Sequence, residues 1–149
     1  MERTSRRHHN SLRQPAVLAW LRLARVFQKI DTRSERFFRE HKLNTAQFDV
    51  LAQVGAASGM TQQELADALL VTKGNISQLL GKLEQDGLIA RRQEGRTNCL
   101  SLTDRGRALF EVVVPQQEAL IAELLAPLSE DEQRELLRLL RKLDHGILT

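Results

Sequence analysis

The chain has 149 residues, 42% of them hydrophobic and 28% charged, which is enough for one globular domain with its own core. Its short apolar runs exclude a membrane span, its N-terminus has no apolar stretch of the signal-peptide type, and its single cysteine excludes an intrachain disulfide framework. We therefore expect a cytoplasmic protein with no membrane partner. Residues 1–42 carry eleven Lys or Arg against four Asp or Glu, which indicates a polyanionic partner.

The first predicted element is a flexible basic arm over residues 1–14, which is polar and unpatterned. Pro15 suits the first turn of a long helix, and a second helix should begin at Asn44 or Thr45. The long helix has two apolar faces at helical spacing. These faces are Val17, Trp20, Leu21, Ala24 and Phe27, and Leu23, Val26, Ile30 and Phe37, while the second helix should bury Phe48, Leu51, Ala52 and Val54.

Two short helices joined by a tight turn are predicted between residues 61 and 87. Thr61 and Glu64 form a T-x-x-E capping box that opens the first helix. Thr72 can cap the second helix, and Gly87 should end it. The expected buried positions are Leu65, Ala68 and Leu69 in the first helix and Ile76, Leu79, Leu80 and Leu83 in the second. Such a pair is a helix-turn-helix candidate.

The outward face of the second short helix carries two glycines among polar side chains. A glycine inside a helix costs about 1 kcal/mol relative to Ala, so close approach to another surface would explain both glycines. Polar side chains of this kind reach base edges and phosphates of duplex DNA. A solvated face with tolerated glycines is the alternative. At 100° per residue, this face holds Gly74, Gln78, Gly81 and Gln85, flanked by Asn75, Ser77 and Lys82.

A β-hairpin is predicted directly after this helix, because residues 88–93 and 98–103 both have the composition of short strands. Glu94 and Gly95 suit a tight turn with Arg96 at or beside the tip. A hairpin in this position is a wing, and its arginines would flank a duplex whose narrow minor groove attracts Arg. An ordinary solvated hairpin with arginines for solubility is the alternative. The candidate DNA contacts of the wing are Arg91, Arg92 and Arg96.

Two further helices are predicted in the C-terminal third. Thr103 can cap the first, which Pro115 should bend, and Ser129 with Glu132 forms a capping box for the second. Their apolar positions are Leu109, Phe110, Val113, Leu120, Ile121, Leu124 and Leu125, then Leu136, Leu137, Leu139, Leu140, Leu143 and Ile147. This is more apolar surface than a small domain can cover alone, so we expect pairing with a twofold mate.

Several ordered blocks resemble the MarR (multiple antibiotic resistance regulator) family of winged helix-turn-helix transcription regulators. The blocks are TQQELADALLVTKGNISQLLGKLEQDGLIARR from residue 61, a Gly-Arg tip, LSLTDRGRAL from residue 100 and LSEDEQRELLRLLRKL from residue 128. The resemblance covers about residues 15–148. It implies a mainly α fold, with dimerisation helices over residues 15–42 and 103–148 and a DNA-binding winged helix with a small β-hairpin wing over residues 44–102.

The resemblance also implies a function. The expected function is that of a homodimeric transcription regulator that binds palindromic double-stranded DNA near promoters. The regulator would be a repressor that a ligand releases from DNA, and it would need no cofactor. By resemblance, residues 61–70 form the first helix of the DNA-reading motif, residues 72–86 the recognition helix and residues 88–102 the wing. The recognition-helix residues assigned to DNA are Thr72, Lys73, Gly74, Asn75, Ser77, Gln78, Gly81 and Lys82.

Two features of the family concern the wing and the ligand crevice. Members commonly carry Asp-x-Arg in the wing, where the Arg enters the minor groove and the Asp helps to fix the loop. Glu94-Gly95-Arg96 stands in that register within a shorter wing, which supports Arg96 and leaves the role of Glu94 open. Family effectors usually enter the crevice between the dimer helices and the reading head. By analogy, an aromatic or phenolic ligand would lie near Trp20, Phe27, His41 and Phe48, for which core roles are the alternative.

Other chemistries have little support. The segment GNISQLLGKL lacks the P-loop spacing, and His8, His9, His41 and His145 lack metal-ligand spacing. No catalytic set is recognisable, so no enzyme activity, metal or cofactor is expected. Cys99 would be thiolate-prone beside Arg91 or Arg92, or is simply a small strand residue. The alternatives are a redox- or metal-sensing regulator on the same scaffold, or a helical protein-interaction module without sequence-specific DNA binding.

Overall fold

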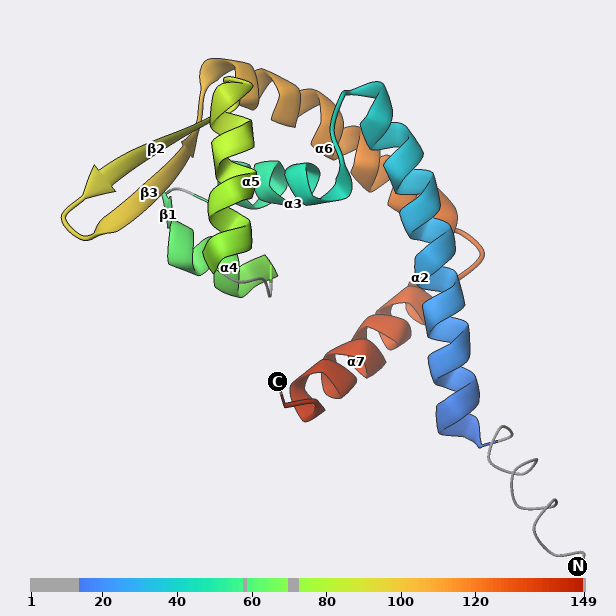
Figure 1. The fold of residues 1–149 in the computed structure, drawn as a ribbon. Coiled ribbons are helices and arrows are strands. Elements are labelled where there is room, and N and C mark those ends of the chain that lie inside the picture. Colours follow the sequence, from blue (N-terminus) through green and yellow to red (C-terminus); the bar gives the residue numbers. More distant parts are fainter. Residues whose placement is uncertain (1–13, 58, 70–72, 149) are drawn as a thin grey trace, which may run out of the picture.

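The computed structural model describes residues 14–57, 59–69 and 73–148 and is mainly helical with one small antiparallel sheet (Figure 1). This confirms the predicted fold class. The predictions for residues 1–13 and for Thr72 lie outside the described residues. The helices are α2 (Pro15–Glu40), α3 (Thr45–Ala56), α4 (Gln62–Leu69), α5 (Lys73–Gln85), α6 (Asp104–Leu125) and α7 (Glu130–Gly146), and the strands are β1 (Met60–Thr61), β2 (Ile89–Glu94) and β3 (Thr97–Leu102).

Local hydrogen bonds determine where most helices begin. Thr61 Oγ1 accepts from the Glu64 N–H at 3.1 Å, and Glu64 Oε2 accepts from the Thr61 N–H at 3.3 Å. The same reciprocal pair forms between Ser129 and Glu132 at 3.2 and 2.9 Å. Helix α3 has a capping box that was not predicted, in which Asn and Gln take the places of Ser or Thr and Glu. Asn44 Oδ1 accepts from the Gln47 N–H at 2.8 Å, and Gln47 Oε1 accepts from the Asn44 N–H at 3.0 Å.

The hydrophobic core lies in the winged helix, where α3, α4 and α5 pack with the sheet and the start of α6. Its members include Val50, Leu51, Leu65, Ile76 and Leu80. The sheet has the order β1-β3-β2, and the β2–β3 hairpin extends away from the helices on the left of Figure 1. A compact core of this kind holds helix α5 and the β2–β3 hairpin in a fixed relation.

One predicted core position is wrong. Ala68 is exposed, and Ala66 beside Leu65 is buried instead. Helix α4 is short and contacts α3, α5, β1 and β3. Because its neighbours enclose it from several sides, its buried face is centred differently from that of a helix lying on a single surface.

Close packing at one glycine joins the wing to α6. A Cβ built on Gly106 would lie 2.0 Å from the carbonyl oxygen of Leu88, so this position tolerates no side chain. The Leu88 carbonyl also accepts from the Thr103 N–H at 3.1 Å. These contacts anchor both ends of the hairpin on the first turn of α6.

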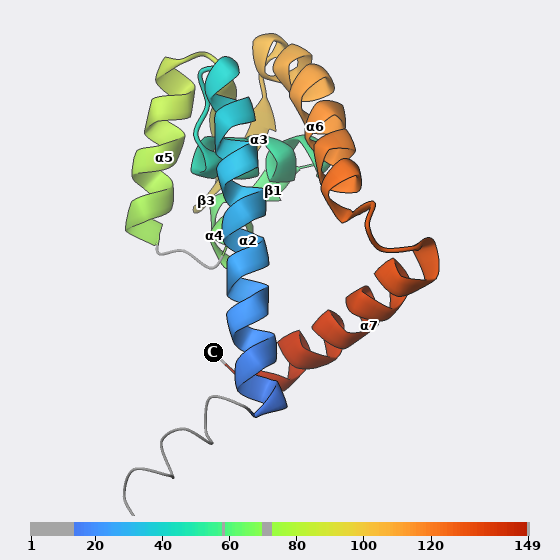
Figure 2. The ribbon, with the colours of Figure 1, turned by 90° about the vertical axis from the view of Figure 1, so that its right-hand side faces the viewer.

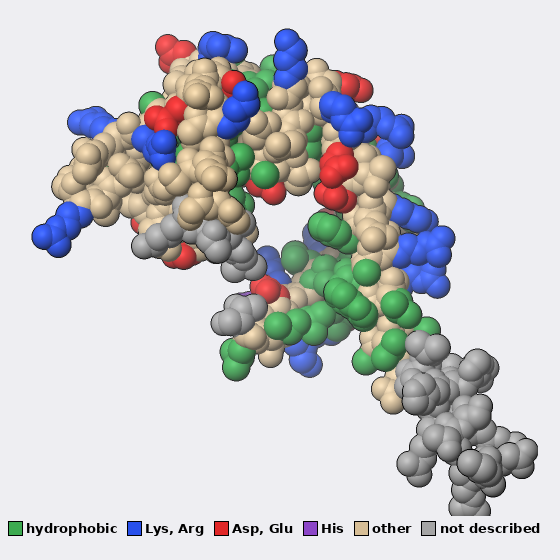
Figure 3. All heavy atoms as spheres, in the orientation of Figure 1, with side chains coloured by type: hydrophobic (Ala, Val, Ile, Leu, Met, Phe, Trp, Pro, Cys, Tyr) green, Lys and Arg blue, Asp and Glu red, His purple; other side chains and the backbone are tan. Residues whose placement is uncertain are grey.

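The N-terminal half of α2 and all of α7 extend away from the winged helix (Figure 2). The C-terminal half of α2 packs on α6, where Gln117 Nε2 donates to the buried Ser34 Oγ at 2.9 Å. Helix α7 buries none of its residues against the rest of the described chain. Figure 3 shows hydrophobic side chains gathered on α7 and on the adjoining part of α2. The exposed large hydrophobic residues are Leu18, Trp20, Leu21, Leu23, Val26 and Phe27 on α2 and Leu137, Leu139, Leu140, Leu143, Ile147 and Leu148 on α7 or directly after it.

Among the helices of the described residues, none is both long and apolar enough to cross a membrane.

Candidate nucleic-acid interface

Helix α5 presents a polar face to solvent, because its apolar stripe is fully used in the core. Ile76, Leu80 and Leu83 are completely buried, and Leu79 is partly buried. The helical period places the residues opposite this apolar stripe on the outer side of α5. Gly74, Asn75, Ser77, Gln78, Lys82 and Gln85 are exposed and Gly81 is partly exposed, while nothing is described of the Lys73 side chain.

The two glycines of this face are not required by packing within the described chain. A Cβ added at Gly74 or at Gly81 would meet no described atom within 4 Å. The space in front of them is therefore open. An open, polar face with glycines can approach another surface more closely than one with side chains at these positions.

Helix α5 ends in a Schellman motif that leads directly into the wing. The Gly87 N–H donates to the Glu84 carbonyl and the Leu88 N–H to the Leu83 carbonyl, both at 3.0 Å. Gly87 has φ +72°, a conformation that favours glycine. The buried side chain of Leu88 then fixes the direction in which β2 leaves the helix.

The turn of the wing is one residue later than predicted. Glu94 still pairs with Thr97 in the β2–β3 ladder, and Gly95 and Arg96 are the two loop residues. Gly95 has φ +62° at the first loop position, as a type II′ hairpin turn requires. Arg96 therefore lies at the tip and is exposed.

The strand register sends Arg91 and Arg92 to opposite faces of the hairpin. Arg92 has a side chain 83% exposed, with its Nε 3.8 Å from Glu94 Oε1. Arg91 faces α5, where its Nε and Nη2 both lie 2.5 Å from Glu84 Oε1. The side chains of Arg91 and Glu84 are only 25% and 34% exposed. The three predicted wing contacts are thus divided into two exposed arginines, Arg92 and Arg96, and one, Arg91, that is bound to α5.

Glu94 and Cys99 interact with each other on the face of the hairpin that carries Arg92. The Cys99 thiol donates to Glu94 Oε2 at 3.4 Å. Partial burial, this hydrogen bond and the charge of Glu94 raise the pKa of the Cys99 thiol above its usual value, with a smaller opposite effect of Thr97. A raised pKa leaves less thiolate at neutral pH, which favours the small strand residue over the reactive thiol.

The four residues expected around an effector crevice do not lie together in the structure of the chain. Trp20 and Phe27 are 64% and 65% exposed on the N-terminal half of α2. Phe48 is a core residue, stacked on Phe38 with ring centroids 4.2 Å apart. His41 packs edge-on against Phe37 and lines a separate cavity.

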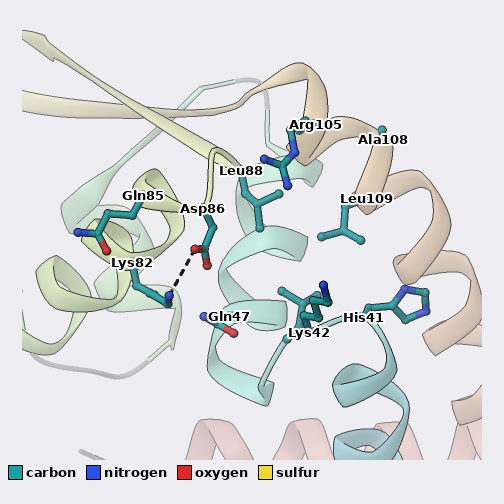
Figure 4. Close-up of a pocket in the computed structure, with 11 residues that line it drawn as sticks. His41, Lys42, Gln47, Lys82, Gln85, Asp86, Leu88, Arg105, Ala108 and Leu109 are labelled. Carbon is teal, nitrogen blue, oxygen red and sulfur yellow. Dashed lines mark hydrogen bonds and ion pairs between the residues drawn. The ribbon is translucent and has the colours of Figure 1, made fainter.

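That cavity of about 850 Å³ lies where the α2–α3 junction, the end of α5 and the start of α6 meet (Figure 4). Sequence reasoning missed it because its walls come from segments far apart in the chain. Its lining residues are His41, Lys42, Leu43, Gln47, Lys82, Gln85, Asp86, Leu88, Arg105, Ala108 and Leu109. Across the ranges that the structure describes, no group of three or more His, Cys, Asp or Glu side chains is placed to hold a metal ion.

Comparisons with known proteins agree with this geometry. Residues 41–97 match the model of the MarR family. An uncharacterized HTH-type transcriptional regulator of Bacillus cereus is 40% identical over 126 residues, which cover 84% of this chain and 86% of the relative. The HTH-type transcriptional regulator PecS of Dickeya dadantii is 32% identical over 132 residues, which cover 85% and 80% of the two chains.

Solved structures of DNA complexes share the fold. A mutant MarR from E. coli complexed with operator DNA has a TM-score of 0.77 at 28% identity, covering 86% of this chain and 94% of that chain. A protein from Listeria monocytogenes, assigned to the MarR family and complexed with a 26mer DNA, has a TM-score of 0.78 at 25% identity, covering 86% and 87%.

Proposed function

Because the chain belongs to the MarR family of HTH-type transcriptional regulators, we propose that it is a homodimeric repressor that binds a palindromic operator and is released by a small ligand. The observation that carries the proposal is the outward face of α5, which is polar, open in front of Gly74 and Gly81, and set beside a hairpin with exposed arginines. A helix of this kind fits the major groove of duplex DNA.

The two reading elements have different roles in this proposal. Asn75, Ser77 and Gln78 on α5 contact base edges or phosphates, together with the neighbouring Lys73 and Lys82. Arg96 at the tip of the wing and Arg92 beside it reach the phosphates or the minor groove. The face of α5 is neutral to basic at its centre, which suits a polyanionic partner.

In this proposal Arg91 positions the wing. It does not make the direct DNA contact that was expected from the sequence. Its guanidinium group already binds Glu84 on the inner side of α5. The ion pair joins the last turn of the recognition helix to the first half of β2. Its purpose is to hold the wing at the angle at which helix and wing contact one duplex together.

The dimer is supported by the apolar surface on α2 and α7. A monomer that leaves the side chains of α7 uncovered exposes a continuous hydrophobic patch to water, which soluble proteins rarely do. A second copy related by a twofold axis covers both patches at once. Two reading heads related by the same axis then match the two halves of a palindromic site.

The test uses the full chain and duplex DNA from the region upstream of its own gene. Footprinting and fluorescence anisotropy over a salt series should show a protected site and an affinity that falls steeply with salt, because phosphate contacts release counterions. Binding without salt dependence, or no protected site, would instead support the protein-interaction module.

A truncated chain that ends at Pro127 tests the dimer. Removal of α7 takes away half of the exposed apolar patch, so the variant should lose dimerisation and operator binding together. Light scattering coupled to size exclusion measures the first and anisotropy the second. A full-length protein that is monomeric and still binds operator tightly would contradict the proposal.

A further inference from the structure

Helix α2 carries a row of basic side chains on one of its faces. Positions spaced by three or four residues lie on the same face of a helix, and all the members of this row are exposed. We call this surface the basic stripe, and its members are Arg22, Arg25, Lys29, Arg33 and Arg36. Figure 3 shows Lys and Arg side chains along the right-hand edge of α2, on the side turned away from the hydrophobic side chains near α7.

The charges of the basic stripe are not balanced within the described chain. None of its members has an ion-pair partner among the residues that the structure describes. The acids of α2 do not interrupt it, because Asp31 and Glu35 lie on other sides of the helix and Glu40 is its last residue. Successive members of the stripe follow each other at i+3 or i+4, so each such pair of like charges repels and lowers the stability of the helix.

The exposed polar side of α7 is built differently. There Arg134 pairs with Glu130 at 2.5 Å and Arg138 with Glu135 at 2.7 Å, so that acids and bases compensate each other one turn apart. Interspersed charges of this kind are sufficient to keep a surface soluble. The basic stripe instead keeps a single sign over about 21 Å, from Arg22 to Arg36 at 1.5 Å per residue. An anionic partner that neutralises the stripe would explain why it repels itself in the free chain.

From these observations we infer that the basic stripe binds the phosphate backbone of a second DNA duplex, independently of base sequence, while the reading heads hold the operator. All but one of its cations are arginines, whose planar guanidinium groups form two parallel hydrogen bonds with a phosphate. Duplex DNA carries one negative charge per about 1.7 Å of its axis, so the length of the stripe spans enough phosphates for every cation. The inference goes beyond the proposed function, in which only α5 and the wing contact DNA.

The surroundings of the basic stripe favour a second duplex over a membrane surface or the operator itself. A helix that binds a membrane surface needs large apolar side chains beside its cations. The stripe is bordered by the polar Gln28 and Thr32 on one side and by Val26 on the other, whereas the exposed aromatic side chains Trp20 and Phe27 lie on the opposite face. The wing leaves the molecule on the left of Figure 1 and the stripe lies on the right-hand side of α2, so a duplex seated on α5 and the wing leaves the stripe uncovered.

The experiment uses the full chain and two labelled duplexes. The first is the upstream duplex of the footprinting test, which carries a donor dye, and the second is a mixed-sequence duplex that carries an acceptor dye. Energy transfer between the dyes reports complexes that hold both duplexes, and it should appear only when the protein is added. Five phosphate contacts give a slope of about −4.5 for log affinity against log salt, so the affinity for the second duplex should fall about 500-fold between about 50 and 200 mM salt.

Matched variants test whether the basic stripe carries this binding. Arg25→Gln with Arg33→Gln should lower the salt slope for the second duplex by about two units and leave binding of the upstream duplex unchanged. The control, Arg134→Gln with Arg138→Gln, removes the same net charge from exposed arginines of α7 and should leave the slope unchanged. Arg25→Lys with Arg33→Lys keeps the charges and should keep most of the slope. Circular dichroism and light scattering should show the wild-type fold and oligomeric state in each variant, because the substituted side chains are exposed.

Three results would overturn the inference. The first is the absence of energy transfer with the wild type, and binding of phosphatidylserine vesicles in its place would assign the stripe to a membrane surface. The second is undiminished binding of the second duplex by the variant with Arg25→Gln and Arg33→Gln. The third is a lower salt slope of that variant for the upstream duplex, since this would place the stripe along the operator.

Footprinting separates this inference from the proposed function. If the upstream duplex is protected but no second duplex is bound through the basic stripe, only the inference fails. If mixed-sequence DNA binds through Arg25 and Arg33 but no site on the upstream duplex is protected, the stripe stands as a sequence-independent DNA site and the proposed function fails.

Discussion

The ion pair between Arg91 and Glu84 leads to a quantitative prediction about the wing. Arg91→Gln or Glu84→Gln leaves a partly buried charge without its partner. A surface pair contributes about 0–1 kcal/mol, and breaking a fully buried pair costs about 3–5 kcal/mol. With side chains 25% and 34% exposed, this pair lies between the two cases. We expect each single variant to lose about 1–2 kcal/mol of unfolding free energy.

A double-mutant cycle with urea unfolding and DNA anisotropy measures this coupling. If Arg91 acts only through Glu84, the double variant should lose little more than either single variant in both assays. Both single variants should then weaken operator binding to a similar extent without a change in the salt slope, because no phosphate contact is removed. The control is Arg92→Gln on the opposite face, which should leave stability unchanged.

Two results would refute the reasoning about Arg91. One is a salt slope that falls by about one unit in Arg91→Gln and not in Glu84→Gln, since this would mean a direct phosphate contact. The other is a pair of losses that simply add in the double variant, since independent residues behave in that way.

Three further predictions concern single positions. Gly81→Leu should keep or raise thermal stability, because a glycine inside a helix costs about 1 kcal/mol, yet weaken operator binding by blocking close approach; unchanged affinity would place that face away from DNA. Arg96→Ala should weaken binding to many duplexes and lower the salt slope by about one unit, whereas Gln78→Ala should cost about 1–3 kcal/mol mainly on the preferred sequence; an unchanged slope for Arg96→Ala would show that the wing does not reach DNA. Burial first, and the charge of Asp31 second, raise the pKa of Asp49. A raised folded-state pKa means that stability is lost as pH rises through it, so Asp49→Asn should raise the melting temperature at pH 7 and much less at pH 3, and equal gains at both would contradict this.

The sequence alone determined the elements and most of their boundaries. Helix starts depend on hydrogen bonds between residues three apart, such as Thr61 with Glu64 and Ser129 with Glu132. Core positions on α5 follow from a period of 3.6 residues. These signals lie within one or two turns of chain, so they can be read without knowing the fold. Once the buried stripe of α5 is known, the remaining positions of the helix make up its polar face.

The tertiary structure decided how side chains from separate elements meet. The side of the hairpin on which Arg91 lies depends on strand register and on Glu84, seven residues earlier on another element. Ala66 is buried where Ala68 was predicted to be, because α4 has neighbours on several sides.

The cavity depended on the fold even more strongly. Its cations, Lys42 and Arg105, come from positions far apart in the chain, and only the packing of α6 against the α2–α3 junction brings them to one space. Periodicity and capping describe a single helix, whereas the distance between two helices depends on every side chain packed between them.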